Sequence, residues 1–275
     1  MSTKLFRLVF QLLSNSIRRI LWLTKESKNS NSSYFNVHLL VVSNTFYARL
    51  ARVCVESFLY LHPNSQIIIH CDSETEGELL RQFRVLKFFR RGKVRLDRLS
   101  NDSVWQLHKL QIILGMNGTS DIFMDCDLRW NGPIGDDARG KIVFFVEERS
   151  LSTYKGVVDA LPGNIKKCSE ASMKNTSYFS WSGIKILESE YDQILNCWQE
   201  LYERTLDKTL SSTESISRIS EQVVLSVFPE LFRLPFVFLK ESDQQFDGSI
   251  CESSYYGASG GRFALWGNTN RKSLF

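Results

Sequence analysis

The first half of the chain contains two kinds of apolar pattern, short continuous runs and longer segments with helical spacing. Short apolar runs at residues 37–42, 66–70 and 121–125 have the length of buried strands. Residues 46–61 instead carry apolar side chains at helical spacing, and this stretch ends just before Pro63. Strands that alternate with helices predict βαβ units, and therefore an α/β fold with a mostly parallel, Rossmann-like sheet and helices on both faces.

The same pattern continues on both sides of these runs and becomes less regular in the second half. Residues 244–275 are rich in Gly, Ser and aromatic residues, and they predict a loop. Further predicted strands lie at residues 93–96, 141–146 and 178–187, and further predicted helices at residues 74–89, 105–116, 191–206 and 214–228.

The first 25 residues follow a pattern of their own. On a helical wheel, residues 4–25 place their apolar side chains on one broad face and Arg7, Gln11 and Arg18 opposite. These polar residues interrupt the apolar run well short of the roughly 20 residues that a membrane-spanning helix needs. We therefore predict an amphipathic helix that binds an anionic membrane surface, or that packs on the protein or on a second subunit, with a mitochondrial transit peptide as a third alternative. Residues 26–33 are the predicted linker.

Composition narrows the class of protein. The chain has 275 residues, of which 43% are hydrophobic and 12% aromatic, with 15 Gly and 5 Pro. These values exclude disorder, collagen and coiled coil for the bulk of the chain, and the length suits a single large domain at residues 34–275 after the N-terminal segment 1–33.

The net charge of +4 is unevenly distributed. Residues 1–25 contain five Lys or Arg and no acid, which leaves a net charge of −1 for residues 26–275. A nucleic-acid binder carries its basic residues on the folded domain, so this distribution argues against nucleic acid as a partner.

The six cysteines indicate a reducing compartment. The two closest, Cys54 and Cys71, are 17 positions apart, which excludes a C-x-x-C zinc or redox site. Several cysteines lie inside apolar runs, where a free thiol behaves as a small buried hydrophobic group. We therefore expect a cytoplasmic protein, which would be peripheral on the inner face of a membrane if its N-terminal helix binds lipid.

The residues with the clearest chemistry follow the apolar run at 121–125. Asp125 and Asp127 end a predicted strand, and two carboxylates there repel each other and lose water unless a cation lies between them. Hard oxygen ligands suit Mg²⁺ or Mn²⁺, with phosphate oxygens completing the coordination. The alternative is a turn with two exposed acids. Ligands of open parallel sheets bind beyond the carboxyl ends of the strands, where Asn44, Tyr47 and Asp72 are also expected.

The order and spacing of these motifs resemble those of GT-A fold glycosyltransferases. Asp125-x-Asp127 resembles their metal-binding motif, and Lys109, in the sequence Leu-His-Lys-Leu, lies on the predicted helix before it. The resemblance covers residues 36–230 and is closest in style to the glycogenin-like and bacterial lipopolysaccharide sugar transferases.

Two shorter motifs downstream extend the resemblance. Ser182-Gly183 resembles a small-residue turn that these enzymes place beside donor and acceptor, and Glu221-Gln222 resembles their acid-Gln helix start. The resemblance implies a nucleotide-binding half at residues 34–130 and an acceptor half at residues 131–275. It also implies transfer of a hexose from a nucleoside-diphosphate sugar to a glycan or glycolipid, as in polysaccharide biosynthesis, with a divalent cation.

One departure from the family concerns the third metal ligand. The relatives commonly supply it from a C-terminal His, whereas all four histidines of this chain lie between residues 38 and 108. The remaining alternatives are Asp247, Asp243, a water molecule, or weak metal binding.

The resemblance also implies roles for residues near the predicted cleft. Lys109 or Arg49 would add a cation to the diphosphate, Tyr47 would stack on the base, and Asn44 and Asp72 would contact the nucleotide. The structural alternatives are solvated charges for the two basic residues, packing at a helix start for Tyr47, and a strand-end cap for Asp72.

The sequence leaves the stereochemistry open. An inverting enzyme needs a carboxylate to deprotonate the acceptor hydroxyl, and Glu221, Glu147 and Glu148 are the candidates. In a retaining enzyme, neutral groups such as Gln222 or Ser182 would line the donor face instead.

Two functions from other classes compete with sugar transfer. A haloacid-dehalogenase-like phosphotransferase also places two aspartates after a strand, but it expects them near the N-terminus. A catalytically silent nucleotide-sugar-binding module on the same fold is favoured if the missing histidine means that no metal binds.

Overall fold

The computed structural model describes most of the first half of the chain and shorter segments of the second half. The described residues are 34–42, 45–84, 92–99, 104–116, 118, 120–126, 128–130, 142–145, 178–181, 188–206, 224, 236–239, 244–246 and 263–265. The predicted amphipathic helix at residues 4–25 and its linker lie outside these ranges. Of the predicted helix at 214–228 only Val224 is described, and it is helical and buried.

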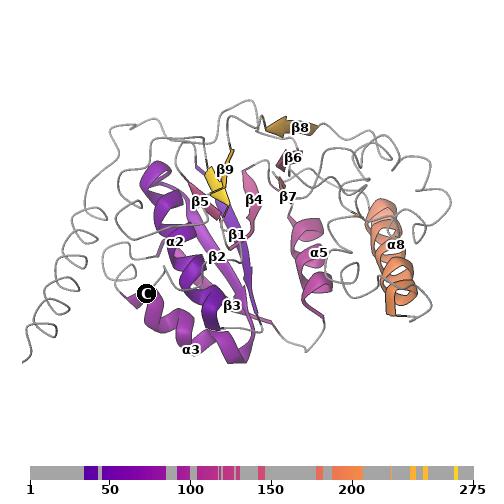
Figure 1. Cartoon of the computed structure of the whole chain (residues 1–275), viewed down its shortest axis with the longest axis horizontal. Coiled ribbons are helices and arrows are strands. Elements are labelled where there is room, and N and C mark those ends of the chain that lie inside the picture. Colours follow the sequence, from indigo (N-terminus) through magenta and orange to yellow (C-terminus); the bar gives the residue numbers. More distant parts are fainter. Residues whose placement is uncertain are drawn as a thin grey trace, which may run out of the picture.

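A four-stranded parallel sheet organises the first half of the chain (Figure 1). Its strands are β1 (Asn36–Val41), β2 (Gln66–Cys71), β3 (Val94–Arg98) and β4 (Asp121–Met124), in the spatial order β3-β2-β1-β4. This confirms the predicted parallel α/β sheet. Because the strands are parallel, their carboxyl ends meet at one edge, and ligands of open α/β sheets bind beyond that edge.

Helices cover both faces of the sheet, as predicted (Figure 1). Helices α2 (Thr45–Leu61) and α3 (Ser73–Gln82) pack on one face, and α5 (Trp105–Gly115) lies on the other. Helix α8 (Glu188–Leu206; Figure 1) begins three residues earlier than predicted. Its first turn contains Glu188 and Glu190, whose negative charges are favourable near a helix N-terminus.

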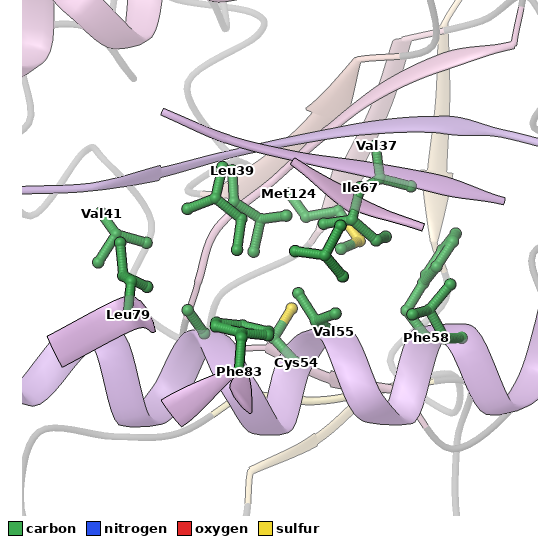
Figure 2. Packing of buried hydrophobic residues seen from close by; sticks show 14 of the residues in the cluster. Val37, Leu39, Val41, Cys54, Val55, Phe58, Ile67, Leu79, Phe83 and Met124 are labelled. Atoms are coloured by element: carbon green, nitrogen blue, oxygen red, sulfur yellow. The ribbon is translucent and has the colours of Figure 1, made fainter. Parts of the chain in front are cut away.

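The main hydrophobic core lies between the sheet and the helices α2 and α3 (Figure 2). Side chains alternate along β1, so that Val37, Leu39 and Val41 all enter this core and are fully buried. Burying one such side chain stabilises the fold by about 1.5–3 kcal/mol. Their partners from the other elements include Cys54, Val55, Phe58, Ile67, Leu79, Phe83 and Met124.

Two smaller sheets are assembled from β5 and from short strands of the second half. One has the order β5-β10-β9 and the other β7-β6-β8. Their strands are β5 (Leu128–Trp130), β6 (Ile142–Phe145), β7 (Tyr178–Trp181), β8 (Phe236–Leu239), β9 (Gln244–Phe246) and β10 (Phe263–Leu265).

The last two strands correct the prediction of a continuous loop at residues 244–275. Each is three residues long, too short to carry a periodic pattern, and β10 is held by pairing with β5 and β9, which lie far from each other in sequence. Helix α3 ends at Gln82, short of the predicted residue 89; Arg84 is helical again, and residues 85–89 lie outside the described ranges. None of the helices in the described ranges is long and apolar enough to cross a lipid bilayer.

Candidate functional site

Asp125 lies at the carboxyl edge of the central sheet, directly after β4. Ile122 and Met124 of this strand enter the main core, whereas Phe123 belongs to the opposite face, where α5 lies. Asp125 also contacts α5, because its carboxylate reaches Lys109 on that helix. Because side chains alternate along β4, Ile122 and Met124 lie in the main core, and Asp125 lies on the opposite face together with Phe123.

Lys109 and Asp125 form an ion pair in which the lysine is buried and the carboxylate is partly buried. The Lys109 Nζ donates to Asp125 Oδ1 at 2.9 Å, and the two side chains are 5% and 19% exposed. The same Nζ lies 5.5 Å from the centre of the Phe123 ring, a distance at which a cation is attracted to the ring face. An ammonium buried without an anion would be costly, so Asp125 makes burial of Lys109 possible. The structure thus brings together two residues that the sequence predicted separately.

The turn that contains Asp125 is held at both ends by α2. At the start of the turn, the Cys54 thiol donates a weak hydrogen bond to the Asp125 carbonyl at 3.6 Å. After the turn, the Trp130 N–H of β5 donates to Ser57 Oγ at 3.0 Å, and the Trp130 ring packs edge-on against Phe58 at 5.4 Å. Neither Ser57 nor Trp130 was predicted to support the site, because these contacts join segments more than 70 residues apart.

Asp72 caps α3 at the same edge of the sheet. It follows β2, and its Oδ1 accepts from the Thr75 backbone N–H at 2.8 Å. The Thr75 hydroxyl lies 2.7 Å from the same Oδ1 and 2.8 Å from the Val41 carbonyl of β1. Asp72 therefore caps α3 directly after β2, which is the strand-end cap that was its structural alternative, and its Oδ1 is already engaged, while Thr75 makes the bond to β1.

Tyr47 and Arg49 lie in the first turns of α2, beyond the carboxyl end of β1. Tyr47 is half-buried, packs against the main core, and meets Phe46 edge-on with ring centres 6.0 Å apart. Arg49 Nε lies 3.6 Å from Glu78 Oε1 on α3. Glu78 also accepts from Arg81 and Gln82, and hydrogen bonding to Arg81 lowers the pKa of this carboxyl. Arg49 therefore helps to join α2 to α3.

The remaining predicted site residues lie outside the described ranges. They are Asn44, Asp127, Glu147, Glu148, Ser182, Glu221 and Gln222, together with Asp243 and Asp247. Within the described ranges, no group of three or more His, Cys, Asp or Glu side chains is arranged to hold a metal ion.

The described residues nevertheless fit one half of a divalent-cation site. Asp125 supplies a carboxylate at the carboxyl edge of a parallel sheet, and Asp127 follows two positions later in the sequence. Only Oδ1 of Asp125 is bonded to Lys109, and no other side chain in the described part of the chain bonds to this carboxylate. A hard oxygen donor of the kind that Mg²⁺ and Mn²⁺ prefer is therefore present at this edge of the sheet.

Two histidines form a partly buried pair that was not predicted from the sequence. His38 Nδ1 of β1 lies 3.0 Å from His70 Nε2 of β2, with the rings stacked at 11°, and His70 Nδ1 lies 3.7 Å from Asp97 Oδ2 of β3. Burial, with a contribution from His38, lowers the pKa of His70 to about 4, and burial also lowers the pKa of His38. Both rings are therefore neutral at neutral pH, and one N–H can donate to the other ring. The available signal was their position on two consecutive predicted strands, at residues 37–42 and 66–70, of a parallel sheet.

Known proteins match the chain in structure but not in sequence. No family model matches it, and no curated protein matches it either. The galactosyltransferase LgtC, solved in complex with donor and acceptor sugar analogues, superimposes with a TM-score of 0.54 at 8% identity, covering 87% of this chain and 91% of LgtC. The bifunctional glycosyltransferase WbbM, solved in its apo form, superimposes with a TM-score of 0.53 at 10% identity, covering 88% of this chain and 47% of WbbM. The chain therefore has a GT-A-like glycosyltransferase fold.

Proposed function

We propose that the protein is a metal-dependent glycosyltransferase of the hexosyltransferase type. It transfers a sugar from a nucleoside-diphosphate sugar to a glycan or glycolipid acceptor. The observation that carries the proposal is the position of Asp125, the first acid of Asp125-x-Asp127, at the carboxyl edge of a GT-A-like sheet and in contact with buried Lys109. The complex of LgtC with donor and acceptor sugar analogues supports a donor and an acceptor as the two substrates.

The acids and the lysine have complementary roles in this proposal. A divalent cation held by Asp125 and Asp127 would neutralise negative charge on the diphosphate leaving group. Asp125 is positioned by β4 before it and by the contacts of α2 on both sides of its turn. Lys109, on α5, adds a fixed positive charge beside the Asp125 carboxylate. Because Lys109 is buried, its charge would act more strongly on the diphosphate.

For the nucleotide base, Tyr47 is the better of the described candidates. It lies in the first turn of α2 at the ligand-binding edge, and an aromatic ring there can stack on a base. Asp72 already uses Oδ1 to cap α3, and Arg49 faces Glu78, whereas Tyr47 packs against the core and Phe46 but is only partly buried. Asn44 remains a proposed nucleotide contact from its place in the sequence between β1 and α2.

The register of the small sheet supports Asp247 as the third metal ligand. Leu128, which follows Asp127, pairs with Leu265 of β10, and Leu265 pairs with Phe246 of β9. Asp247 directly follows Phe246 in the sequence, and Asp127 directly precedes Leu128. Both acids therefore adjoin the same end of this sheet. Asp243 directly precedes the opposite end of β9. We expect Asp247→Asn to weaken Mn²⁺ binding at least tenfold and Asp243→Asn, its matched control, to leave it unchanged.

The residues that we propose to act on the acceptor and to line the donor face all lie outside the described ranges. Glu147, Glu148 or Glu221 would serve as the base of an inverting enzyme, and Gln222 or Ser182 would line the donor face of a retaining one. The anomeric configuration of the product, read by NMR, decides between these two sets.

We also propose that residues 4–25 hold the enzyme at an anionic membrane surface. Their basic and apolar faces suit a helix that lies in the headgroup region, where a lipid-linked acceptor would be within reach.

A thermal-shift experiment tests the transferase proposal. The intact protein is heated with UDP, GDP, CDP or ADP, with and without Mn²⁺, and compared with the Asp125→Asn, Asp127→Asn double variant. We expect one nucleotide to raise the melting temperature only with Mn²⁺, and the double variant to lose this effect. Asp192→Asn, which removes an exposed acid of α8, is the matched control and should behave as wild type.

Other outcomes separate the competing functions. If no nucleotide gives a metal-dependent shift, the transferase proposal is wrong. Release of inorganic phosphate from phosphorylated substrates would instead support the phosphotransferase. Nucleotide binding without release of nucleoside diphosphate from any nucleotide sugar would support the silent binding module.

A further inference from the structure

Lys109 occupies an unusual position for a lysine. Its side chain is 5% exposed, and its Nζ lies 2.9 Å from Asp125 Oδ1 and 5.5 Å from the ring centre of Phe123. Lysine is almost never fully buried unless it is paired with an anion. The positive charge is therefore fixed in place, and it belongs to the resting state of the site.

In the proposed function, Asp125 consequently binds both the Lys109 ammonium and the divalent cation. Its carboxylate carries one negative charge, and Lys109 already neutralises that charge through Oδ1. A divalent cation bound to the same carboxylate would lie within a few ångströms of the ammonium, since both contact the same group. Two positive charges at such a distance repel each other, and the repulsion is strong where water is excluded.

A nucleoside diphosphate removes this conflict because it brings its own negative charge. Its phosphate oxygens can neutralise both the ammonium and the cation, so neither depends on Asp125 alone. Binding of the diphosphate therefore favours binding of the cation, and by linkage the cation favours the diphosphate by the same factor.

We propose that Lys109 makes the binding of the divalent cation and the nucleoside diphosphate mutually dependent. The free enzyme binds the bare cation weakly, and the site takes up the cation together with the nucleotide. This inference rests on the proposed function, and it assigns to Lys109 the control of metal affinity at Asp125.

Mn²⁺ titrations followed by electron paramagnetic resonance test the proposal, because free Mn²⁺ is counted directly without an activity assay. Titrations are run on the intact protein alone and with a saturating amount of the nucleotide that gives the metal-dependent thermal shift. For wild type we expect Mn²⁺ alone to bind at least tenfold more weakly than Mn²⁺ with nucleotide. For Lys109→Met we expect Mn²⁺ alone to bind at least tenfold more tightly than in wild type, and the effect of the nucleotide to shrink.

Three further variants control for charge, shape and folding. Lys109→Arg keeps the positive charge and should keep the weak affinity for bare Mn²⁺. Lys109→Gln serves if the methionine variant does not fold. Lys93→Met removes the same charge beside β3, where Nζ bonds the Asn64 carbonyl, and should change neither titration.

The outcomes distinguish this inference from the proposed function. If wild type shows metal-dependent nucleotide binding but Lys109→Met binds bare Mn²⁺ no more tightly, Lys109 does not control metal affinity and this inference alone is overturned. If wild type shows no metal-dependent binding of any nucleotide, both proposals are overturned.

Discussion

In the Lys109–Asp125 pair, each charge is compensated by the other. Lys109 is buried between α5 and the sheet, and its charge is compensated by the carboxylate 2.9 Å away. Removing one partner of such a pair leaves an uncompensated buried charge, which costs more than removing both. The two residues are therefore a structural unit as well as part of the proposed site.

A double-mutant comparison tests this unit. We expect Asp125→Asn to lower the free energy of unfolding by about 3 kcal/mol, because the buried Lys109 ammonium loses its ion pair with this carboxylate. Adding Lys109→Met should restore most of this loss, since it removes the buried charge and roughly keeps the volume of the side chain. Urea denaturation of the single and double variants measures both effects. Equal and additive losses would mean that the two side chains do not interact.

The His38–His70 pair predicts how stability depends on pH. The pKa of His70 is lowered to about 4 in the folded protein by burial and by His38, against about 6.5 in the unfolded chain. Between these values the unfolded chain binds more protons, so stability is full above pH 6.5 and falls as the pH drops towards 4. His70 alone would account for a loss on the order of 3 kcal/mol. The other groups that act on the pair are Asp121, Arg95, Asp97 and His108.

Urea denaturation at a series of pH values from 7.5 to 4.5 checks this prediction. We expect the unfolding free energy of wild type to fall over this range and that of the His38→Asn, His70→Asn double variant to fall less steeply. Parallel curves for the two proteins would show that the pair does not titrate on unfolding.

At the scale of elements, the acidic turn depends on how β5 docks on α2. β5 is only three residues long, yet its Trp130 is 5% exposed, packs on Phe58 and bonds Ser57. The turn between β4 and β5 is thus held by tertiary contacts rather than by its own sequence, and it contains both acids of the proposed metal site.

Truncating Trp130 should therefore affect both stability and binding. We expect Trp130→Ala to lower the unfolding free energy by about 3–5 kcal/mol, because a large buried side chain is lost. Under conditions where the variant remains folded, its metal-dependent thermal shift with nucleotide should also be smaller than that of wild type. Leu80→Ala, which truncates an exposed residue of α3, should change stability by less than about 1 kcal/mol. A full thermal shift in Trp130→Ala would mean that the docking of β5 does not position the site.

The predicted elements agree with the structure where their pattern is long. The helix predicted at residues 46–61 is observed as Thr45–Leu61, and the strand predicted at 66–70 as Gln66–Cys71. The prediction was wrong for β9 and β10, because three-residue strands have no measurable period and exist only through pairing.

At the scale of the whole molecule, the uneven charge predicts where a membrane would bind. Residues 4–25 are basic and amphipathic, but residues 81–98 also hold eight Lys or Arg and a single acid, and Arg95 and Arg98 are well exposed. Either segment would attract an anionic surface, so the two must be tested separately.

Cosedimentation with phosphatidylglycerol vesicles separates the two segments, with phosphatidylcholine vesicles as the uncharged control. We expect deletion of residues 1–25 to abolish pelleting, because the apolar face of the helix is lost together with its charges. The Arg95→Glu, Arg98→Glu variant should still pellet. The opposite result would place the membrane contact on the β3 edge and overturn the proposed anchor.

The sequence by itself determined the class of fold and the most informative residues. The period of its apolar positions depends only on local backbone geometry, so it predicted the parallel α/β sheet, and the position of Asp125 after an apolar strand predicted a site at the sheet edge. The tertiary structure alone decided which residues meet. It paired Lys109 with Asp125, joined Trp130 to α2, and brought His38 against His70. These contacts depend on strand register and helix packing, which join residues 16 to 73 positions apart and leave no local pattern in the sequence.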